Sequence, residues 1–165
     1  MDKGNGMSGA ARYFTRPRLR CPVAKGEAMQ GKPVNPGLAE AEAIVTTQMF
    51  GFWGGVDTQT GEIIDARHEL CGQNIKGKVF VFPEGRGSTV GAAVILELVR
   101  CGVAPAAIVN LKTEGILASG AILADKFYQV AMPVVDSLSE EDFYSIKTGD
   151  TLRVDGSRGE VTVLR

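Results

Sequence analysis

Residues 78–102 limit the possible folds more than any other stretch, because they read as strand, glycine-rich turn and helix in succession. The apolar run Lys78–Phe82 predicts a short strand. Gly85 and Gly87 then allow backbone angles and close approaches that a Cβ atom would forbid. The nearly continuous apolar run Val90–Val99 predicts a helix directly after the turn. Such a chain is expected to build a mixed α/β domain around a strand–turn–helix unit.

The turn between this strand and this helix offers several groups that favour a negative charge. Ser88 or Thr89 can cap the helix, whose first N–H groups lack acceptors within the helix. The helix dipole and Arg86 add positive potential at the same place. We therefore predict that Gly85, Arg86, Gly87 and Thr89 bind a carboxylate or phosphate, and that the same field helps Ser88 to lose a proton. The alternative is that the glycines only turn the chain and Ser88 only caps the helix.

Composition sets limits on the type of protein. A chain of 165 residues with 44% hydrophobic residues is expected to form one main domain, and a net charge of −1 favours neither nucleic acid nor an anionic membrane. The scattered cysteines, Cys21, Cys71 and Cys101, with the single histidine, form no zinc motif. They suggest a reducing, cytoplasmic environment. No run approaches the roughly 20 apolar residues of a membrane span.

The chain divides into two parts by composition. Residues 1–35 are basic and rich in glycine and proline, without a sustained period, and are expected to form an extended arm. Residues 36–165 are expected to form the folded domain. Its further predicted elements are strands at 41–47, 62–65 and 130–135, the last at a sheet edge, a helix from the capping box at 137–140 to about 146, and a C-terminal β-hairpin of 151–155 and 160–164.

A second strand–loop–helix unit follows the first. Ala106–Asn110 predicts a strand and Ile116–Lys126 an apolar helix. Parallel pairing with a right-handed crossover is the default arrangement of two such units. Both loops then lie at the carboxyl edge of the sheet, where open α/β sheets bind ligands. Asn110, Thr113 and Glu114 of the second loop are therefore expected near Ser88.

Two further features lie before the central strand. Two aromatic residues are followed directly by two glycines in Phe52-Trp53-Gly54-Gly55, and Val56 and Asp57 come next. This stretch is either part of the core or a surface that lets another chain approach closely. His68 lies in a polar stretch, and we expect a histidine at the surface or in a turn.

Common nucleotide and hydrolase motifs do not fit the glycine-rich turn. The turn is longer than a dinucleotide-binding turn, and no acidic residue follows Asn110 directly. It lacks the Gly-Lys-Ser/Thr of a Walker loop, and a serine hydrolase would need G-x-S-x-G and a histidine base. The turn therefore reads as an incomplete active site whose missing chemistry another chain supplies.

Several blocks of the sequence resemble the small, swivelling-domain component of aconitase X-type enzymes. The central block, Val81-Phe-Pro-Glu-Gly-Arg-Gly-Ser-Thr-Val-Gly91, is close to that family's pattern FPxGKGSTVGS. The resemblance covers residues 36–165. Two positions depart from it, because Arg86 stands where lysine is common and Ala92 where serine is common. The other blocks that resemble the family are 42–45, 52–57, 60–61, 102–110, 113–114 and 147–150.

The resemblance implies a swivelling β/β/α fold like the mobile domain of aconitase. It also implies a hydro-lyase in which a larger partner subunit carries an iron–sulfur cluster, with no cofactor or metal bound by this chain. The substrate would be a small hydroxy acid of the phosphomevalonate or cis-3-hydroxy-L-proline class. Ser88 matches the serine that acts as the base in aconitase-like chemistry. Phe52, Trp53, Gly54, Gly55 and Asp57 are the candidate partner interface.

Two other functions stay open from the residues. The chain can be a free-standing module that binds an anionic metabolite without transforming it. It can also be a structural or regulatory subunit that uses residues 52–55 to hold a partner.

Overall fold

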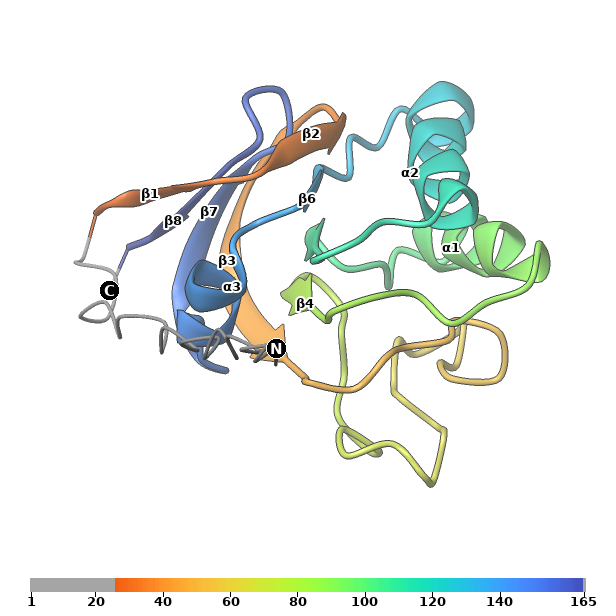
Figure 1. The fold of residues 1–165 in the computed structure, drawn as a ribbon. Helices are drawn as coiled ribbons and strands as arrows, with labels where there is room; N and C mark the ends of the chain where they lie inside the picture. Colours follow the sequence, from red (N-terminus) through yellow and green to blue (C-terminus); the bar gives the residue numbers. More distant parts are fainter. Residues whose placement is uncertain (1–25, 165) are drawn as a thin grey trace, which may run out of the picture.

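The structure, a computed structural model, describes residues 26–164. Eight strands form one sheet in the order β1-β8-β7-β3-β4-β5-β6-β2, and three helices accompany it (Figure 1). The elements are β1 (Ala28–Gln30), β2 (Lys32–Asn35), β3 (Leu38–Val45), β4 (Val79–Val81), α1 (Val90–Arg100), β5 (Ala107–Val109), α2 (Gly115–Tyr128), β6 (Val134–Asp136), α3 (Glu140–Ser145), β7 (Thr151–Asp155) and β8 (Glu160–Val163).

The centre of the sheet is parallel, as the two strand–loop–helix units predict. β3, β4, β5 and β6 pair in parallel, and the crossovers between the last three are α1 and α2. Successive side chains of β4 point to opposite faces, so that Phe80 packs on the helix side while Val79 and Val81 join the other core cluster. Both faces of this part are therefore apolar, which explains why Lys78–Phe82 reads as a continuous apolar run rather than an alternating one.

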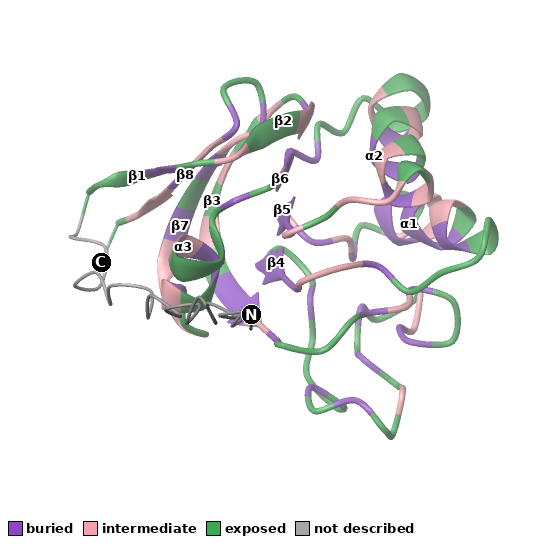
Figure 2. Cartoon of the chain, viewed as in Figure 1, coloured by how far each residue is buried: buried purple, intermediate pink, exposed green. Residues whose placement is uncertain are grey.

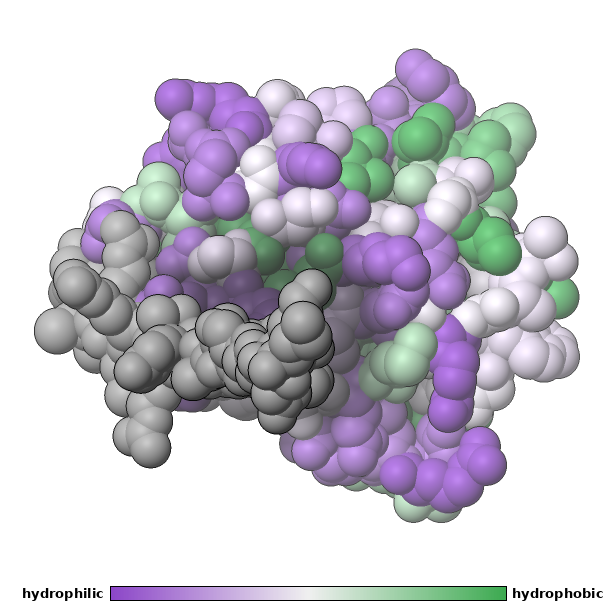
Figure 3. Space-filling view, in the orientation of Figure 1, coloured by the Kyte–Doolittle hydropathy of each residue, from purple (hydrophilic) through white to green (hydrophobic). Residues whose placement is uncertain are grey.

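The helices α1 and α2 lie together on one face of the parallel strands (Figure 1). Figure 2 shows that the buried residues of both helices line the sides that face the sheet. The two helices approach closely at Gly120, where an added Cβ would lie 3.0 Å from Ile95 and 3.2 Å from the Cα of Ala92. In Figure 3 apolar side chains gather over α2, whereas the region of the β3–β4 connection is mostly hydrophilic. None of the described helices is long and apolar enough to cross a membrane.

The N-terminal boundary of the folded domain lies earlier than expected. Residues 28–35, which the sequence analysis assigns to the arm, form β1 and β2 at opposite ends of the strand order. Only Gly31 separates these two strands, so the sheet must curl until its two ends come close. The backbone N–H of Gly31 donates to the carbonyl of Gly159 at 2.8 Å. Residues 1–25 of the predicted arm lie outside the described residues.

Three local predictions need correction. The strand expected at 130–135 begins later, as β6, and it is not an edge strand because β2 pairs with its outer side. The strand expected at 62–65 is reduced to isolated bridges of Glu62 and Ile63. The cap of α3 is Ser139, whose hydroxyl accepts from the backbone N–H of Asp142 at 3.1 Å, rather than Ser137. The C-terminal β-hairpin is confirmed as β7 and β8.

Candidate functional site

The glycine-rich loop between β4 and α1 rests on an aromatic cluster. Phe50 contacts the rings of Phe52 and Phe80 at centroid distances of 5.1 and 4.8 Å, and Phe82 completes the cluster. The backbone of Phe50 also pairs with the loop, since its N–H donates to the carbonyl of Glu84 at 3.2 Å and its carbonyl accepts from Arg86 N–H at 2.8 Å. The loop therefore has a rigid, buried support.

Ser88 lies at the start of α1 and is exposed. Thr89 is the N-cap residue, but its side chain makes no capping hydrogen bond. Across the described part of the chain, no acceptor lies within hydrogen-bond distance of the backbone N–H groups of Gly87, Ser88, Thr89 and Val90. The hydroxyl and four free donors thus lie together at the positive end of a helix of 11 residues.

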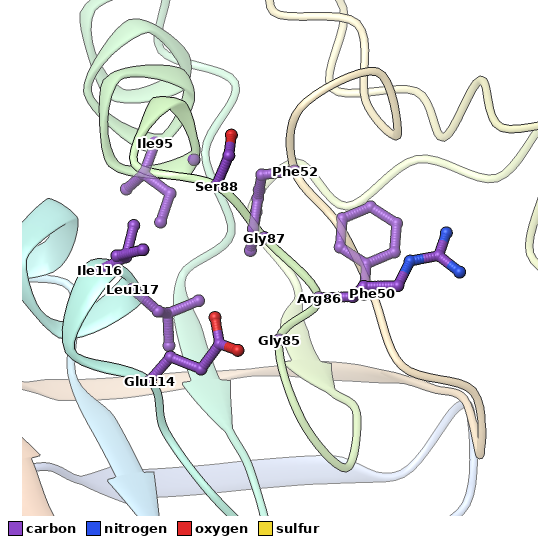
Figure 4. A pocket seen from close by; sticks show the side chains of 11 residues that line it. Phe50, Phe52, Gly85, Arg86, Gly87, Ser88, Ile95, Glu114, Ile116 and Leu117 are labelled. Atoms are coloured by element: carbon purple, nitrogen blue, oxygen red, sulfur yellow. The ribbon is translucent and has the colours of Figure 1, made fainter.

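A narrow cavity of about 20 Å³ separates this loop from the start of α2 (Figure 4). Ser88 lines it together with Glu114, the residue that precedes α2. An added Cβ on Gly85 would lie 3.2 Å from a carboxylate oxygen of Glu114, so the glycine leaves room for that carboxylate. The remaining walls are mostly apolar and come from Phe50, Phe52, Ile95, Ile116 and Leu117. The prediction that Glu114 lies near Ser88 is confirmed.

Arg86 also borders this cavity, but its side chain does not lie beside the Ser88 hydroxyl. Figure 4 shows its side chain pointing away from the side chains of Ser88 and Glu114. Its guanidinium lies 3.8 Å from a carboxylate oxygen of Asp65, which belongs to the β3–β4 connection. Hydrogen bonds from the backbone and side chain of Arg67, helped by the charges of Arg67 and Arg86, hold the pKa of Asp65 below its ordinary value of 3.8. The cation expected beside the Ser88 hydroxyl therefore occupies the other side of the loop.

The two loops at the carboxyl edge are tied together by Asn110. Its side chain is fully buried and donates to the carbonyl of Phe82 at 2.7 Å, while its side-chain oxygen accepts from the Thr113 hydroxyl at 3.4 Å. Asp136, at the end of β6, accepts from the backbone N–H of Thr113 at 3.1 Å. Asn110 and Thr113 thus connect the two loops. Of the three second-loop candidates Asn110, Thr113 and Glu114, it is Glu114 that lines the cavity.

The five candidate interface residues divide into buried and exposed positions. Phe52 and Gly55 are buried within this chain. Asp57 is half-buried, and its carboxylate accepts from the backbone N–H groups of Gln59 and Thr60. Trp53 has 68% of its surface exposed, and Gly54 beside it is also exposed. Within this segment, Trp53 and Gly54 are the residues that present free surface to another chain.

His68 lies in a turn, one of the two positions expected for it, and it is buried there rather than at the surface. Only 8% of its surface is exposed, and its ring packs edge-on against Phe50 at a centroid distance of 5.3 Å. Burial, the largest effect, lowers the pKa of His68 below its ordinary value of 6.5. The residues next to His68 in the sequence are polar, so the sequence does not indicate that His68 is buried. The sequence also does not indicate that Asp65 or Asp136 belongs to a site.

Residues 26–164 contain no group of three or more histidine, cysteine, aspartate or glutamate side chains placed to hold a metal ion. Cys71 and Cys101 are both free. The described part of this chain therefore offers no ligand set that fits an iron–sulfur cluster.

Fold and site together define an α/β domain that presents a serine and free N–H groups at the carboxyl edge of its parallel strands. A family profile described as "Aconitase X swivel domain" matches residues 28–163. The chain belongs to this aconitase X swivel-domain family. The match begins at β1, in agreement with the earlier boundary of the folded domain.

Curated relatives and solved structures are similar to almost the whole domain. The phosphomevalonate dehydratase small subunit of Methanosarcina acetivorans is 41% identical over 83% of this chain and 91% of the relative. That of Methanocaldococcus jannaschii is 46% identical over 82% of this chain and 97% of the relative. In the crystal structure of aconitase X from Thermococcus kodakaraensis, in its holo-form, one chain is 42% identical and superposes with a TM-score of 0.78, covering 85% of this chain and all of that one.

Proposed function

We propose that the chain is the small subunit of a heteromeric dehydratase that removes water from phosphomevalonate, and that Ser88 supplies the base. The chain is a dehydratase subunit, as its relatives are. The substrate in the names of these relatives favours phosphomevalonate over cis-3-hydroxy-L-proline. The observation that carries the proposed role of Ser88 is an exposed hydroxyl beside four unpaired backbone N–H groups at the start of α1.

The reaction needs a base that removes a proton from the carbon next to the one that carries the hydroxyl. In the proposed step Ser88, after giving up its own hydroxyl proton, acts as an alkoxide: its oxygen takes the proton from carbon and the C–H electron pair forms the carbon–carbon double bond. The C–O bond of the neighbouring carbon breaks with its electron pair, and the departing hydroxide takes up a proton and leaves as water. A serine alkoxide is unfavourable in water. Free N–H groups and a helix dipole stabilise it best where water is excluded.

The large subunit would complete the site. The Ser88 cavity is narrow and lies at the surface of the described chain, so a partner that covers it would exclude water from the reacting atoms. The exposed residues Trp53 and Gly54 are proposed as part of the contact. An iron–sulfur cluster is proposed for the large subunit, since the described residues of this chain do not fit one. Glu114, on the opposite wall, is proposed to contact the substrate.

Substitution of Ser88 by alanine tests this proposal. Ser88 is exposed and its side chain makes no hydrogen bond in the structure, so S88A is expected to fold and to bind the large subunit normally. Turnover of phosphomevalonate by the reconstituted pair should fall by about 10²- to 10⁴-fold, the usual contribution of a positioned base. The matched control is Ser157→Ala, an exposed serine in the β7–β8 turn, which should retain full activity.

Two outcomes would contradict the proposal. Wild-type turnover by S88A would remove Ser88 from the chemistry. A chain that binds phosphomevalonate tightly alone, and adds no turnover when mixed with the large subunit, would instead be the free-standing binding module.

A further inference from the structure

A second hollow lies on the side of the glycine-rich loop that Arg86 faces. It has a volume of about 390 Å³, and its walls combine two arginines, a histidine, an aspartate, an amide and a thioether. All but Arg86 come from the long connection between β3 and β4. The lining residues are Gln48, Met49, Asp65, Arg67, His68 and Arg86.

His68, one of the residues that line this hollow, carries a buried hydrogen-bond donor without a partner among the described residues. The Nδ1 atom of His68 accepts from the backbone N–H of Leu70 at 3.2 Å, so the proton of the neutral ring is on Nε2. Nε2 is buried and has no hydrogen-bond partner among the described residues. Such an unpaired buried donor destabilises the folded chain, and an acceptor that pairs with it would recover that cost.

The outer wall is cationic and only partly neutralised. Nε of Arg67 donates to Asp65 at 3.2 Å, which leaves the terminal nitrogens of Arg67 available. The guanidinium of Arg86 makes no hydrogen bond within the described chain, because its distance of 3.8 Å from Asp65 is too long for one. The carboxylate of Asp65 would repel a bound anion, but its single negative charge lies beside the two positive guanidinium groups of Arg67 and Arg86. Glu69, the next carboxylate, accepts hydrogen bonds from Thr46 and Thr47 instead.

We propose that this hollow binds a phosphoryl oxyanion held by Arg86 and Arg67, and that a movement of the His68 ring brings its buried Nε2–H to the anion as a third donor. Guanidinium groups match phosphate oxygens in pairs, and the imidazole offers a donor from a third direction. A tetrahedral dianion uses donors from three directions better than a planar carboxylate does. On the proposed function, on which this assignment to substrate rests, the site would hold the phosphoryl end of the substrate beside the loop that carries Ser88.

Because the chain has a single histidine, its ring resonances report on this site without ambiguity. The experiment records the ring ¹⁵N–¹H correlations of the full chain without a histidine tag, while inorganic phosphate is added at constant ionic strength. We expect a saturable shift of the His68 signals. The R86Q variant should lower the affinity by at least about tenfold, as expected for lost hydrogen bonds between charged groups, and R67Q should lower it less.

The controls separate specific binding from general charge effects. Arg158 is similarly exposed, pairs with Glu160 at 3.2 Å and lies in the β7–β8 turn, so R158Q should bind phosphate like the wild type. Its signals and those of R86Q should match the wild type before phosphate is added, which shows that the site is folded. Acetate should bind more weakly than phosphate. The inference fails if the shift does not saturate, if R86Q equals R158Q, or if acetate binds as tightly.

The test does not depend on turnover. S88A should bind phosphate like the wild type, because Ser88 lies outside the second hollow. Failure of phosphate binding would leave the role of Ser88 untouched. An active S88A enzyme would overturn that role without affecting the phosphate site.

Discussion

The glycine-rich loop separates two unlike surfaces of one small domain. The Ser88 side is narrow and mostly apolar, and the carboxylate of Glu114 lines it, whereas Arg86, which also borders this cavity, turns its guanidinium away. The Arg86 side is wide and carries two guanidinium groups and a buried imidazole. A single residue, Gly87, separates Ser88 from Arg86 in the sequence. Under the two proposals made above, the Ser88 side would remove a proton and the Arg86 side would hold an anionic group.

The segment at Phe50 and Gly51 packs against the glycine-rich loop that carries both sides. A substitution there that displaces the loop should therefore affect both sides. An added Cβ on Gly51 would lie 2.5 Å from the carbonyl oxygen of Arg86, a contact that the loop can relieve only by moving. G51A is expected to lower the free energy of unfolding by about 3 kcal/mol, at the upper end of overpacking effects. Both phosphate binding and turnover should weaken with it. Urea unfolding measures the stability.

Gly115 is the matched control for this substitution. It is exposed, and an added Cβ there meets no atom within 4 Å, so G115A should leave stability unchanged or slightly improved. If G51A is as stable as G115A, the loop is not anchored at Gly51 and the two sides have separate supports.

A second substitution should have a smaller effect on stability and should affect only the Ser88 side. Asn110→Ala leaves the buried carbonyl of Phe82 without its donor, so it should cost about 2 kcal/mol of stability and lower turnover. Phosphate binding on the Arg86 side should persist. Thermal unfolding and the phosphate titration together measure both effects.

Asn74 provides the comparison for this variant. Its side chain also donates to a carbonyl, that of Thr60, at 2.7 Å, but the residue is exposed and water can replace the bond. N74A should therefore cost less than N110A. Equal losses would show that the burial of Asn110 does not matter, and loss of phosphate binding in N110A would show that the two sides are not independent.

The sequence predicts the parallel strands, their two helices and the closeness of Glu114 to Ser88, because these follow from local patterns and from one topological rule. The strands β1 and β2 could not be found in this way. Each is three or four residues long, and their pairing partners in β8 and β6 lie about a hundred residues away. Their stability comes from long-range pairing rather than from their own composition.

The direction of the Arg86 side chain is predicted wrongly for a different reason. The pattern Gly85-Arg86-Gly87-Ser88 places a cation and a hydroxyl close in sequence, but glycines on both sides of Arg86 leave its direction to tertiary contacts. Asp65 lies far earlier in the sequence and attracts Arg86 to the other side. His68 is buried for a similar reason, because the ring of Phe50, distant in the sequence, packs against it.

The smallest expected effect belongs to the Arg86 side and appears as a pH dependence of stability. Burial lowers the pKa of His68, so below pH 6.5 the unfolded chain binds more protons than the folded chain. Stability is then complete above pH 6.5 and is lost as the pH falls through the lower, folded pKa. The slope is at most about 1.4 kcal/mol per pH unit for one proton. Asp65 and Glu69, whose pKa values are lowered from 3.8 and 4.5, contribute only at lower pH.

The His68→Phe variant isolates this contribution, because phenylalanine keeps the packing against Phe50 and removes the titrating group. Unfolding free energies of the wild type should decrease from pH 6.5 to 5, and those of H68F should decrease less. Phosphate bound at the imidazole would favour the protonated ring, so saturating phosphate should flatten the wild-type slope and leave H68F unchanged. If wild type and variant share one slope, His68 titrates as an exposed histidine and the basic side lacks its buried donor.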